Sequence, residues 1–222
     1  MTNPRYININ RILGAMTFLI SFIVYFDTMA PSVSYWDCGE FIAVSYTLGV
    51  PHPPGSPLFL LLGRIASMLP ISEDIAFRVN LLSPLASAFS VLFLYFIIVQ
   101  LVNHWRGKIE TNTDALIAFG AGVVGSLTFA FTDSHWFNAV EAEVYAFSTF
   151  FTAIVVWLAL LWSEKANEKG NERYILIIAY MIGLATGLHL LNLLTIPFVA
   201  LLIYFKKYKF CLLYTSPSPR DQ

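Results

Sequence analysis

Six long apolar runs constrain this chain more than any other feature of its sequence. A helix needs roughly 20 mainly apolar residues to cross the hydrocarbon core of a membrane, and the last two runs are shorter than that. Backbone groups inside lipid must bond within their own segment, so continuous runs are helices rather than barrel strands. The sequence therefore predicts an all-α, polytopic transmembrane bundle with about six spans. The runs cover residues 12–30, 81–102, 115–131, 144–162, 174–188 and 193–205.

The composition excludes several classes of soluble protein. Hydrophobic residues make up 57% of the 222 residues and charged residues only 12%, against about 25% charged residues in a soluble domain. The net charge of -1 offers no basic surface for nucleic acid. Cys38 and Cys211 form neither a disulfide framework nor a metal-ligand spacing. We therefore expect membrane lipid, and no nucleic acid, as a partner.

The basic residues predict the orientation of the chain. If the N-terminus is cytoplasmic, the inner segments hold most lysines and arginines, and the outer segments hold only Arg64 and Arg78. The first run follows Arg5 and Arg11 without a small-residue cleavage site, so we interpret it as a retained signal anchor. We expect a multi-pass protein of a bacterial inner membrane, with its outer loops in the periplasm.

The outer loops differ in length. They cover residues 31–80, residues 132–143 and a tight turn at 189–192. The first is predicted to hold two short helices, at about 37–48 and 57–69, which lie along the membrane interface and can wall a cavity.

The end of the chain departs from this pattern. We interpret residues 1–210 as one truncated membrane domain, the N-terminal piece of a longer protein. Residues 211–222 lose the apolar pattern abruptly and are typical of a non-native, adapter-derived tail.

The sharpest polar feature lies in the first outer loop. Asp37 and Glu40 are three residues apart, so on a helix they share a face. An alternative is a capping box, with Asp37 as the N-cap and Glu40 at the third helical position; such a cap can also present a carboxylate to a cavity. His52 lies in a rigid bend of prolines and glycine. The alternative for His52 is a solvated turn.

The other outer loops also carry polar residues. Glu141 and Glu143 lie near the hydrocarbon boundary, where retained acids usually face a wet cavity. Residues two apart do not share a helix face, so we expect at most one, Glu143, to point inward. The alternative is a solvated loop anchored by Trp136. His189 and Asn192 lie three residues apart in the third outer turn. The alternative is an ordinary loop between two spans.

Four segments carry a family resemblance. Residues 35–41 (YWDCGEF) and 48–58 (LGVPHPPGSPL) resemble the opening of glycosyltransferase family 117, a bacterial membrane family related to a eukaryotic class of protein O-mannosyltransferases. Residues 139–145 and 187–189 resemble its later motifs, and the match covers roughly residues 10–205.

The resemblance implies a GT-C fold and an enzyme of the glycosyltransferase class. Such an enzyme transfers a sugar, mannose or similar, from a polyprenyl-phosphate carrier to a hydroxyl of an exported protein or glycan. By position, the resemblance implies Asp37 as the catalytic carboxylate and Glu40 as its companion.

The chemistry of an inverting transfer fits these residue types. One carboxylate takes the proton of the acceptor hydroxyl, which is typically worth about 10²–10⁴-fold in rate. A cation such as Arg64 or Arg78 can hold the developing phosphate charge, although each can also be a snorkelling interface residue. No metal ligand and no cofactor beyond the lipid-linked donor are assigned, and a divalent metal is left open. The predicted substrate-binding residues are His52, Arg64, Arg78, Glu141, Glu143, His189 and Asn192.

Two other functions stay open. A transporter or flippase for a lipid-linked or polar solute would carry polar or broken helices at the bilayer midplane. Here the centres of the runs are apolar, and Gly120, Gly122 and Gly125 indicate close helix packing instead. A structural assembly subunit would leave the loop carboxylates dispensable.

Overall fold

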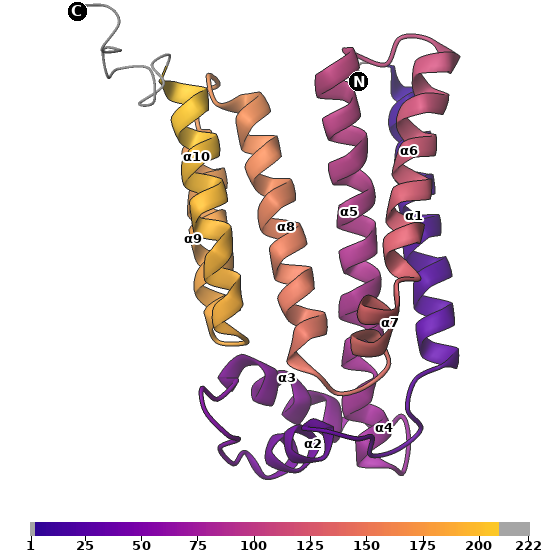
Figure 1. Ribbon diagram of the computed structural model, residues 1–222, viewed down its shortest axis with the longest axis vertical. Helices are drawn as coiled ribbons and strands as arrows, with labels where there is room; N and C mark the ends of the chain where they lie inside the picture. Colours follow the sequence, from indigo (N-terminus) through magenta and orange to yellow (C-terminus); the bar gives the residue numbers. More distant parts are fainter. Residues whose placement is uncertain (1–2, 209–222) are drawn as a thin grey trace, which may run out of the picture.

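The computed structural model describes residues 3–208, and these residues form helices and no strands. Six long helices lie side by side, and shorter helices cover one end of them (Figure 1). The predicted all-α polytopic bundle is confirmed. The elements are α1 (Pro4–Asp27), α2 (Cys38–Thr47), α3 (Pro57–Met68), α4 (Ile75–Asn80), α5 (Leu82–Arg106), α6 (Asn112–Ala130), α7 (Asp133–Ala139), α8 (Val144–Lys165), α9 (Glu172–Thr186), the 3-10 turn η1 (Leu190–Leu194) and α10 (Thr195–Lys207).

Five stretches of the described chain are long and apolar enough to cross a membrane, one fewer than predicted. They are α1, α4 with α5, α6, α8, and η1 with α10. The exception is α9, whose 15 residues extend only about 22 Å at 1.5 Å per residue. The run at 174–188 does form a helix beside α8, but it ends before it reaches the length of a full span. The chain is an integral, multi-pass membrane protein.

Helix α5 is the centre of the bundle and packs against α1, α6 and α8. On α6, a Cβ at Gly122 would lie 2.8 Å from Tyr95 and Val99, and one at Gly125 would lie 2.7 Å from Ile98. These two glycines therefore permit the close helix packing that the sequence predicts. For Gly120 that prediction is wrong, because its Cβ would face open space.

A layer of short helices covers one end of the bundle (Figure 1). The two predicted helices of the first loop are confirmed as α2 and α3, and they pack on α4. Phe41, Phe59 and Val79 from this layer bury themselves against Val144 of α8 and Leu188 beyond α9. Helices α4 and α7 were not predicted. This layer, with α7, is called the loop end below.

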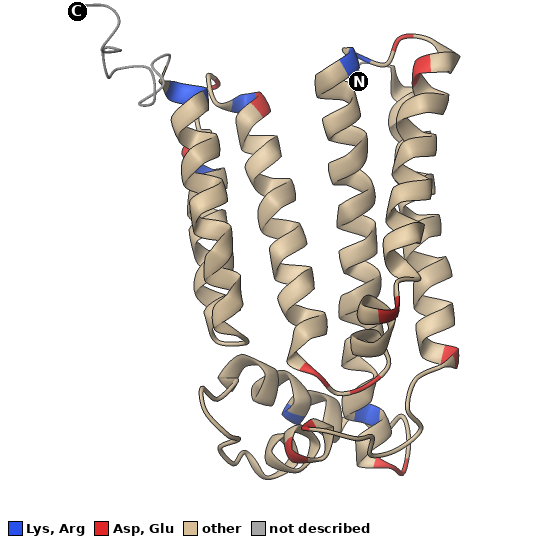
Figure 2. Ribbon diagram, viewed as in Figure 1, with Lys and Arg blue, Asp and Glu red and all other residues tan. Residues whose placement is uncertain are grey.

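The opposite end, called the terminal end, holds the start of α1 and the end of α10 (Figure 1). Lysines and arginines gather there, whereas at the loop end α3 and α4 carry the cations Arg64 and Arg78 (Figure 2). The charge asymmetry of the sequence is therefore an asymmetry between the two ends of one bundle. The predicted tail at 211–222 lies outside the described residues.

Candidate active site at the loop end

Three polar side chains meet at the start of α2. The His52 ring Nδ1 lies 2.7 Å from Glu40 Oε2, and the His52 backbone N–H donates to Glu40 Oε1 at 2.7 Å. His52 Nε2 lies 3.9 Å from Asp37 Oδ2. The side chains of Asp37, Glu40 and His52 are 57%, 39% and 45% exposed. This group, called the exposed trio, is open to a substrate.

The backbone around the trio turns sharply for local reasons. Leu48 ends α2 in the left-handed conformation (φ 53°), and Gly55 (φ 75°) helps the chain turn back towards α3. Trp36, directly before Asp37, also has a positive φ of 59°, which is uncommon for a bulky residue. Such conformations concentrate at functional sites. They return His52 to the first turn of α2.

The capping-box interpretation of this segment is wrong. Asp37 is the N-cap residue of α2, but its side chain makes no capping hydrogen bond. Glu40 does occupy the third helical position, yet its carboxylate accepts from His52 instead of the N-cap backbone. Both carboxylates therefore stay available to the site rather than to the helix end.

The contact between Glu40 and His52 favours the charged form of both side chains. The hydrogen bond from His52 holds the pKa of Glu40 below its usual range. The same bond raises the pKa of His52, and the negative charges of Glu40, Asp37 and Glu143 add to the effect. One ligand atom from each member of the trio lies within 4.8 Å of the others. A divalent cation bound there would displace the proton that His52 shares with Glu40.

Two buried carboxylates lie beside the trio. Glu141 and Glu143 are only 4% and 6% exposed, so the prediction that at most one points inward is wrong. The segment forms a tight turn, with the Glu143 N–H donating to the Glu141 carbonyl at 2.8 Å. Ser34 donates to the Glu141 carboxylate, and Cys38 Sγ lies 3.8 Å from Glu143 Oε1. These two carboxylates are called the buried pair.

Burial changes the titration of this second group. It raises the pKa of Glu143 to about 7, with smaller contributions from the charges of Asp37 and Glu141. Burial also raises the pKa of the Cys38 thiol, and the same two glutamates add to it. Near neutral pH, Glu143 therefore exchanges a proton, while Cys38 stays a thiol that donates to the carboxylates.

Asn80 joins the first outer loop to the turn that carries the buried pair, and sequence reasoning missed it. The side chain is fully buried. Its Nδ2 donates to the Ala30 and Ser32 carbonyls, both at 2.9 Å, and its Oδ1 accepts from the Ala142 N–H at 3.1 Å. Asn80 thus joins the start of the first loop to the turn between Glu141 and Glu143. The available signal was an amide side chain at the entry of an apolar span.

The two arginines of the loop end lie elsewhere. Arg64 donates to the Tyr46 carbonyl and lies over the Tyr46 ring, with 5.4 Å from its Cζ to the ring centroid. Tyr46 lies towards the end of α2, whereas the trio lies at its start. Arg78 donates to the Ser72 and Ser67 carbonyls at 2.6 and 2.8 Å. Both side chains therefore brace the layer of short helices.

His189 and Asn192 stabilise the third turn. The His189 ring accepts from the Leu191 N–H at 3.2 Å and packs on Tyr145 with 5.2 Å between centroids. Buried Asn192 donates to the carbonyls of Ala185 and His189 at 3.1 and 3.0 Å. The structure records contacts of these residues with α8 and α9, but none with the exposed trio.

The fold and the site define a class. A helical membrane bundle with carboxylates and a histidine gathered over one end is a polytopic membrane protein with a polar site at its interface.

The family is also shown. The family model described as "Protein O-mannosyl-transferase TMEM260 N-terminal domain" matches residues 37–211. The chain belongs to this family, and the match begins at Asp37 of the exposed trio. The resemblance to protein O-mannosyltransferases is thereby confirmed.

Two relatives carry the same name. The chain is 31% identical over 204 residues to "Protein O-mannosyl-transferase tmem260" of Dictyostelium discoideum, covering 85% of this chain and 23% of the relative. It is 29% identical over 162 residues to "Protein O-mannosyl-transferase TMEM260" of Mus musculus, covering 73% of this chain and 21% of the relative. The chain thus spans less than a quarter of these relatives. No solved structure matches it.

Proposed function

We propose that this chain carries the catalytic loop of a membrane glycosyltransferase. The enzyme moves a sugar, mannose or similar, from a polyprenyl-phosphate carrier to a hydroxyl of an exported protein or glycan. The observation that carries the proposal is the exposed trio, two carboxylates and a histidine in mutual contact at one end of the bundle. Membership in the O-mannosyltransferase family supports the sugar and the protein acceptor.

Asp37 is the general base in this proposal. Its carboxylate takes the proton of the acceptor hydroxyl while the acceptor oxygen bonds to the anomeric carbon of the sugar. The bond from that carbon to the phosphate oxygen breaks, and its electron pair leaves with the phosphate. Attack opposite the leaving group inverts the anomeric centre. Asp37 suits this role because it is the most exposed carboxylate of the trio and makes no capping bond.

His52 supplies the positive charge that the leaving phosphate needs, and Glu40 holds it in place. Glu40 fixes His52 through two 2.7 Å contacts and favours its protonated form. The protonated ring then stabilises phosphate charge in a fixed geometry, which costs no reorganisation during the reaction. Arg64 and Arg78 were the first candidates for this role, but their guanidinium groups are bonded to backbone carbonyls.

We also propose that the loop end faces away from the cytoplasm, with the N-terminus inside. In a bacterial inner membrane this places the trio at the periplasmic face. The gathering of lysines and arginines at the terminal end supports this orientation (Figure 2).

The test uses the full-length protein in proteoliposomes with polyprenyl-phosphate mannose and an acceptor peptide that carries serine and threonine. We expect transfer by the wild type and a loss of about tenfold or more in Glu40→Gln, since its histidine loses its fixed position. Glu73→Gln is the matched control, an exposed carboxylate between α3 and α4.

Movement of the lipid-linked sugar across the bilayer is measured in the same vesicles. Movement without transfer would favour the transporter or flippase and contradict the enzyme. Equal transfer by Glu40→Gln and Glu73→Gln would remove the trio from the reaction.

A further inference from the structure

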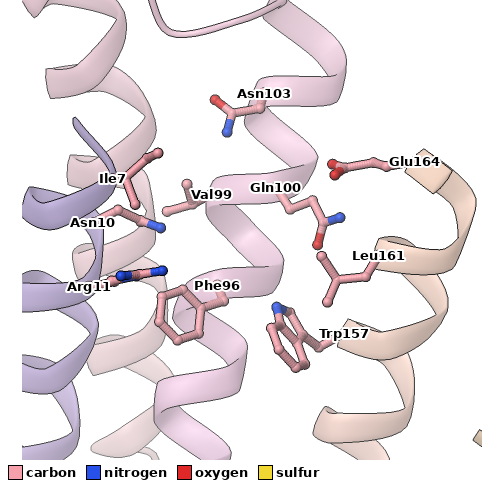
Figure 3. Close-up of a pocket in the computed structure, with 10 residues that line it drawn as sticks. All are labelled: Ile7, Asn10, Arg11, Phe96, Val99, Gln100, Asn103, Trp157, Leu161 and Glu164. Carbon is pink, nitrogen blue, oxygen red and sulfur yellow. The ribbon is translucent and has the colours of Figure 1, made fainter. Parts of the chain in front are cut away.

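A polar cavity lies at the terminal end, away from the exposed trio. It has a volume of about 310 Å³ and lies between α1, α5 and α8 (Figure 3), within the size range of small-ligand pockets. Gln100, in its wall, lies 18 residues beyond the start of α5, or about 27 Å along the helix. The cavity is therefore separate from the site at the loop end.

Each helix gives one stripe of side chains to this cavity. Gln100 and Asn103 lie three apart on α5, Asn10 and Arg11 come from α1, and Trp157 and Glu164 lie seven apart on α8. Spacings of three, four and seven residues place side chains on one helix face. Phe96 and Leu161 add apolar walls among these polar groups (Figure 3).

Several polar atoms of the residues that line the cavity are buried without a partner. Asn10 Oδ1, Asn103 Oδ1 and both amide atoms of Gln100 make no hydrogen bond with any residue that the structure describes. A buried donor or acceptor left in this state costs about 1–3 kcal/mol, so proteins rarely retain one without a use. Gln100 presents a donor and an acceptor together.

The two charged side chains at the rim of the cavity, Arg11 and Glu164, do not pair with each other. Arg11 and Glu164 reach towards α5 from opposite sides (Figure 3). Within the described part of the chain both ion pairs involve His52, so Arg11 and Glu164 are not bonded to each other. A cation and an anion with amide groups between them match a ligand that carries both charges.

The depth of the cavity favours a lipid. Arg11 lies seven residues after the start of α1 and Gln100 six before the end of α5, about 10 Å into the bundle from its terminal end. Glu164 lies in the last turn of α8. The cavity therefore spans the region where headgroups meet acyl chains, and the Trp157 indole is a ring type enriched at that depth.

We infer that this cavity binds the headgroup of a zwitterionic phospholipid, one that carries a phosphate and an ammonium. Arg11 and the amide N–H groups hold the phosphate, while Glu164 and the amide carbonyls of Gln100 and Asn103 hold the ammonium. An anionic headgroup would meet repulsion from Glu164, and a purely cationic one would meet repulsion from Arg11. The inference does not rest on the proposed transferase activity.

The test uses the full-length protein in nanodiscs whose bulk lipid is the anionic phosphatidylglycerol, which does not compete as a zwitterion, together with a phosphatidylethanolamine that carries a photoreactive group near its headgroup. After irradiation, mass spectrometry locates the adducts. We expect adducts on the cavity-lining ends of α1, α5 and α8. Gln100→Leu and Arg11→Gln should lower them by about fivefold or more, the effect of one lost hydrogen bond worth about 1 kcal/mol. Arg106→Gln is the control, an exposed cation at the same end.

A third variant separates recognition from folding. Glu164→Gln should lose the preference for phosphatidylethanolamine over phosphatidylglycerol while it still labels with both lipids. Absence of adducts on these three helices in the full-length protein would overturn the inference. That result is also expected if other parts of the full-length chain fill the cavity, and the inference is then equally overturned. An equal loss of adducts in Arg106→Gln would contradict specific binding, because it would show that labelling depends on general surface charge. Soluble phosphoethanolamine could also abolish the adducts at concentrations that leave the bulk lipid unchanged. That result would assign the cavity to a soluble ligand and overturn the inference of a lipid.

Discussion

The exposed trio and the buried pair lie side by side at the loop end, yet their carboxylates have opposite surroundings. His52 contacts both Asp37 and Glu40, and all three side chains stay open to water. Glu141 and Glu143 are buried and receive hydrogen bonds from Ser34 and Cys38 of the first loop. The difference indicates a division of labour. In the proposed function, the exposed trio carries the chemistry and the buried pair fixes the loop that presents it.

Asn80→Leu should have the largest effect, because it breaks the joint between the two regions. It leaves the carbonyls of Ala30 and Ser32 and the N–H of Ala142 without their partner. Several unsatisfied buried groups together cost about 3 kcal/mol or more. We expect a large fall in Tm with loss of transfer. Asn138→Leu is the control, since its amide bonds only within α7. Equal Tm values for the two variants would show that Asn80 does not hold the two regions together.

Glu143→Gln tests the buried region through pH. The pKa of Glu143 in the folded protein, about 7, lies above the ordinary glutamate value of 4.5, so the folded state binds more protons than the unfolded state between these values. The contribution of Glu143 to stability is therefore most favourable at low pH and falls as pH rises through this window, by up to about 3 kcal/mol. We expect the slope of Tm against pH to flatten in Glu143→Gln and to persist in Glu73→Gln. An unchanged slope in Glu143→Gln would assign the titration to another group.

His52→Asn tests the exposed region with little effect on stability, because exposed ion pairs contribute little. We expect transfer to fall about tenfold with Tm unchanged. In the wild type, the rate should also decline as pH rises through the raised pKa of His52, since the protonated ring holds the phosphate. His104→Asn, an exposed histidine at the terminal end, is the control. A fall in Tm that matches the loss of rate would make His52 a structural residue.

Arg64→Gln should have the smallest effect. Its guanidinium contacts the Tyr46 carbonyl and ring rather than the trio. We expect kcat/KM for transfer to stay within about threefold of the wild type. A rise in KM for the lipid donor of tenfold or more would restore Arg64 as the phosphate ligand and weaken the role given to His52.

The sequence predicted the bundle well because apolar runs and basic residues are local signals. It placed α2 and α3, and it placed Asp37, Glu40 and His52 in one loop. The prediction from the two-residue spacing of Glu141 and Glu143 was wrong. It assumed that the two residues lie on a helix, whereas they lie in a tight turn in which both carboxylates are buried. Helix α4 was missed because it leads directly into α5.

Asn80 could not be predicted, since its bonds join residues 48, 50 and 62 positions away. The contact of His52 with Glu40 also depends on a turn with Leu48 at positive φ, a conformation that a leucine does not signal. Pairings of this kind follow from the folded chain and not from residue spacing.

The division of labour is tested most directly by kcat/KM for mannose transfer in Asp37→Asn, measured with Tm on the same full-length preparation. Asparagine keeps the size of Asp37 but cannot take the acceptor's proton. We predict a fall of about 100-fold or more with Tm unchanged, because the Asp37 side chain makes no capping bond. A rate within about threefold of the wild type would contradict the assignment of the chemistry to the exposed trio.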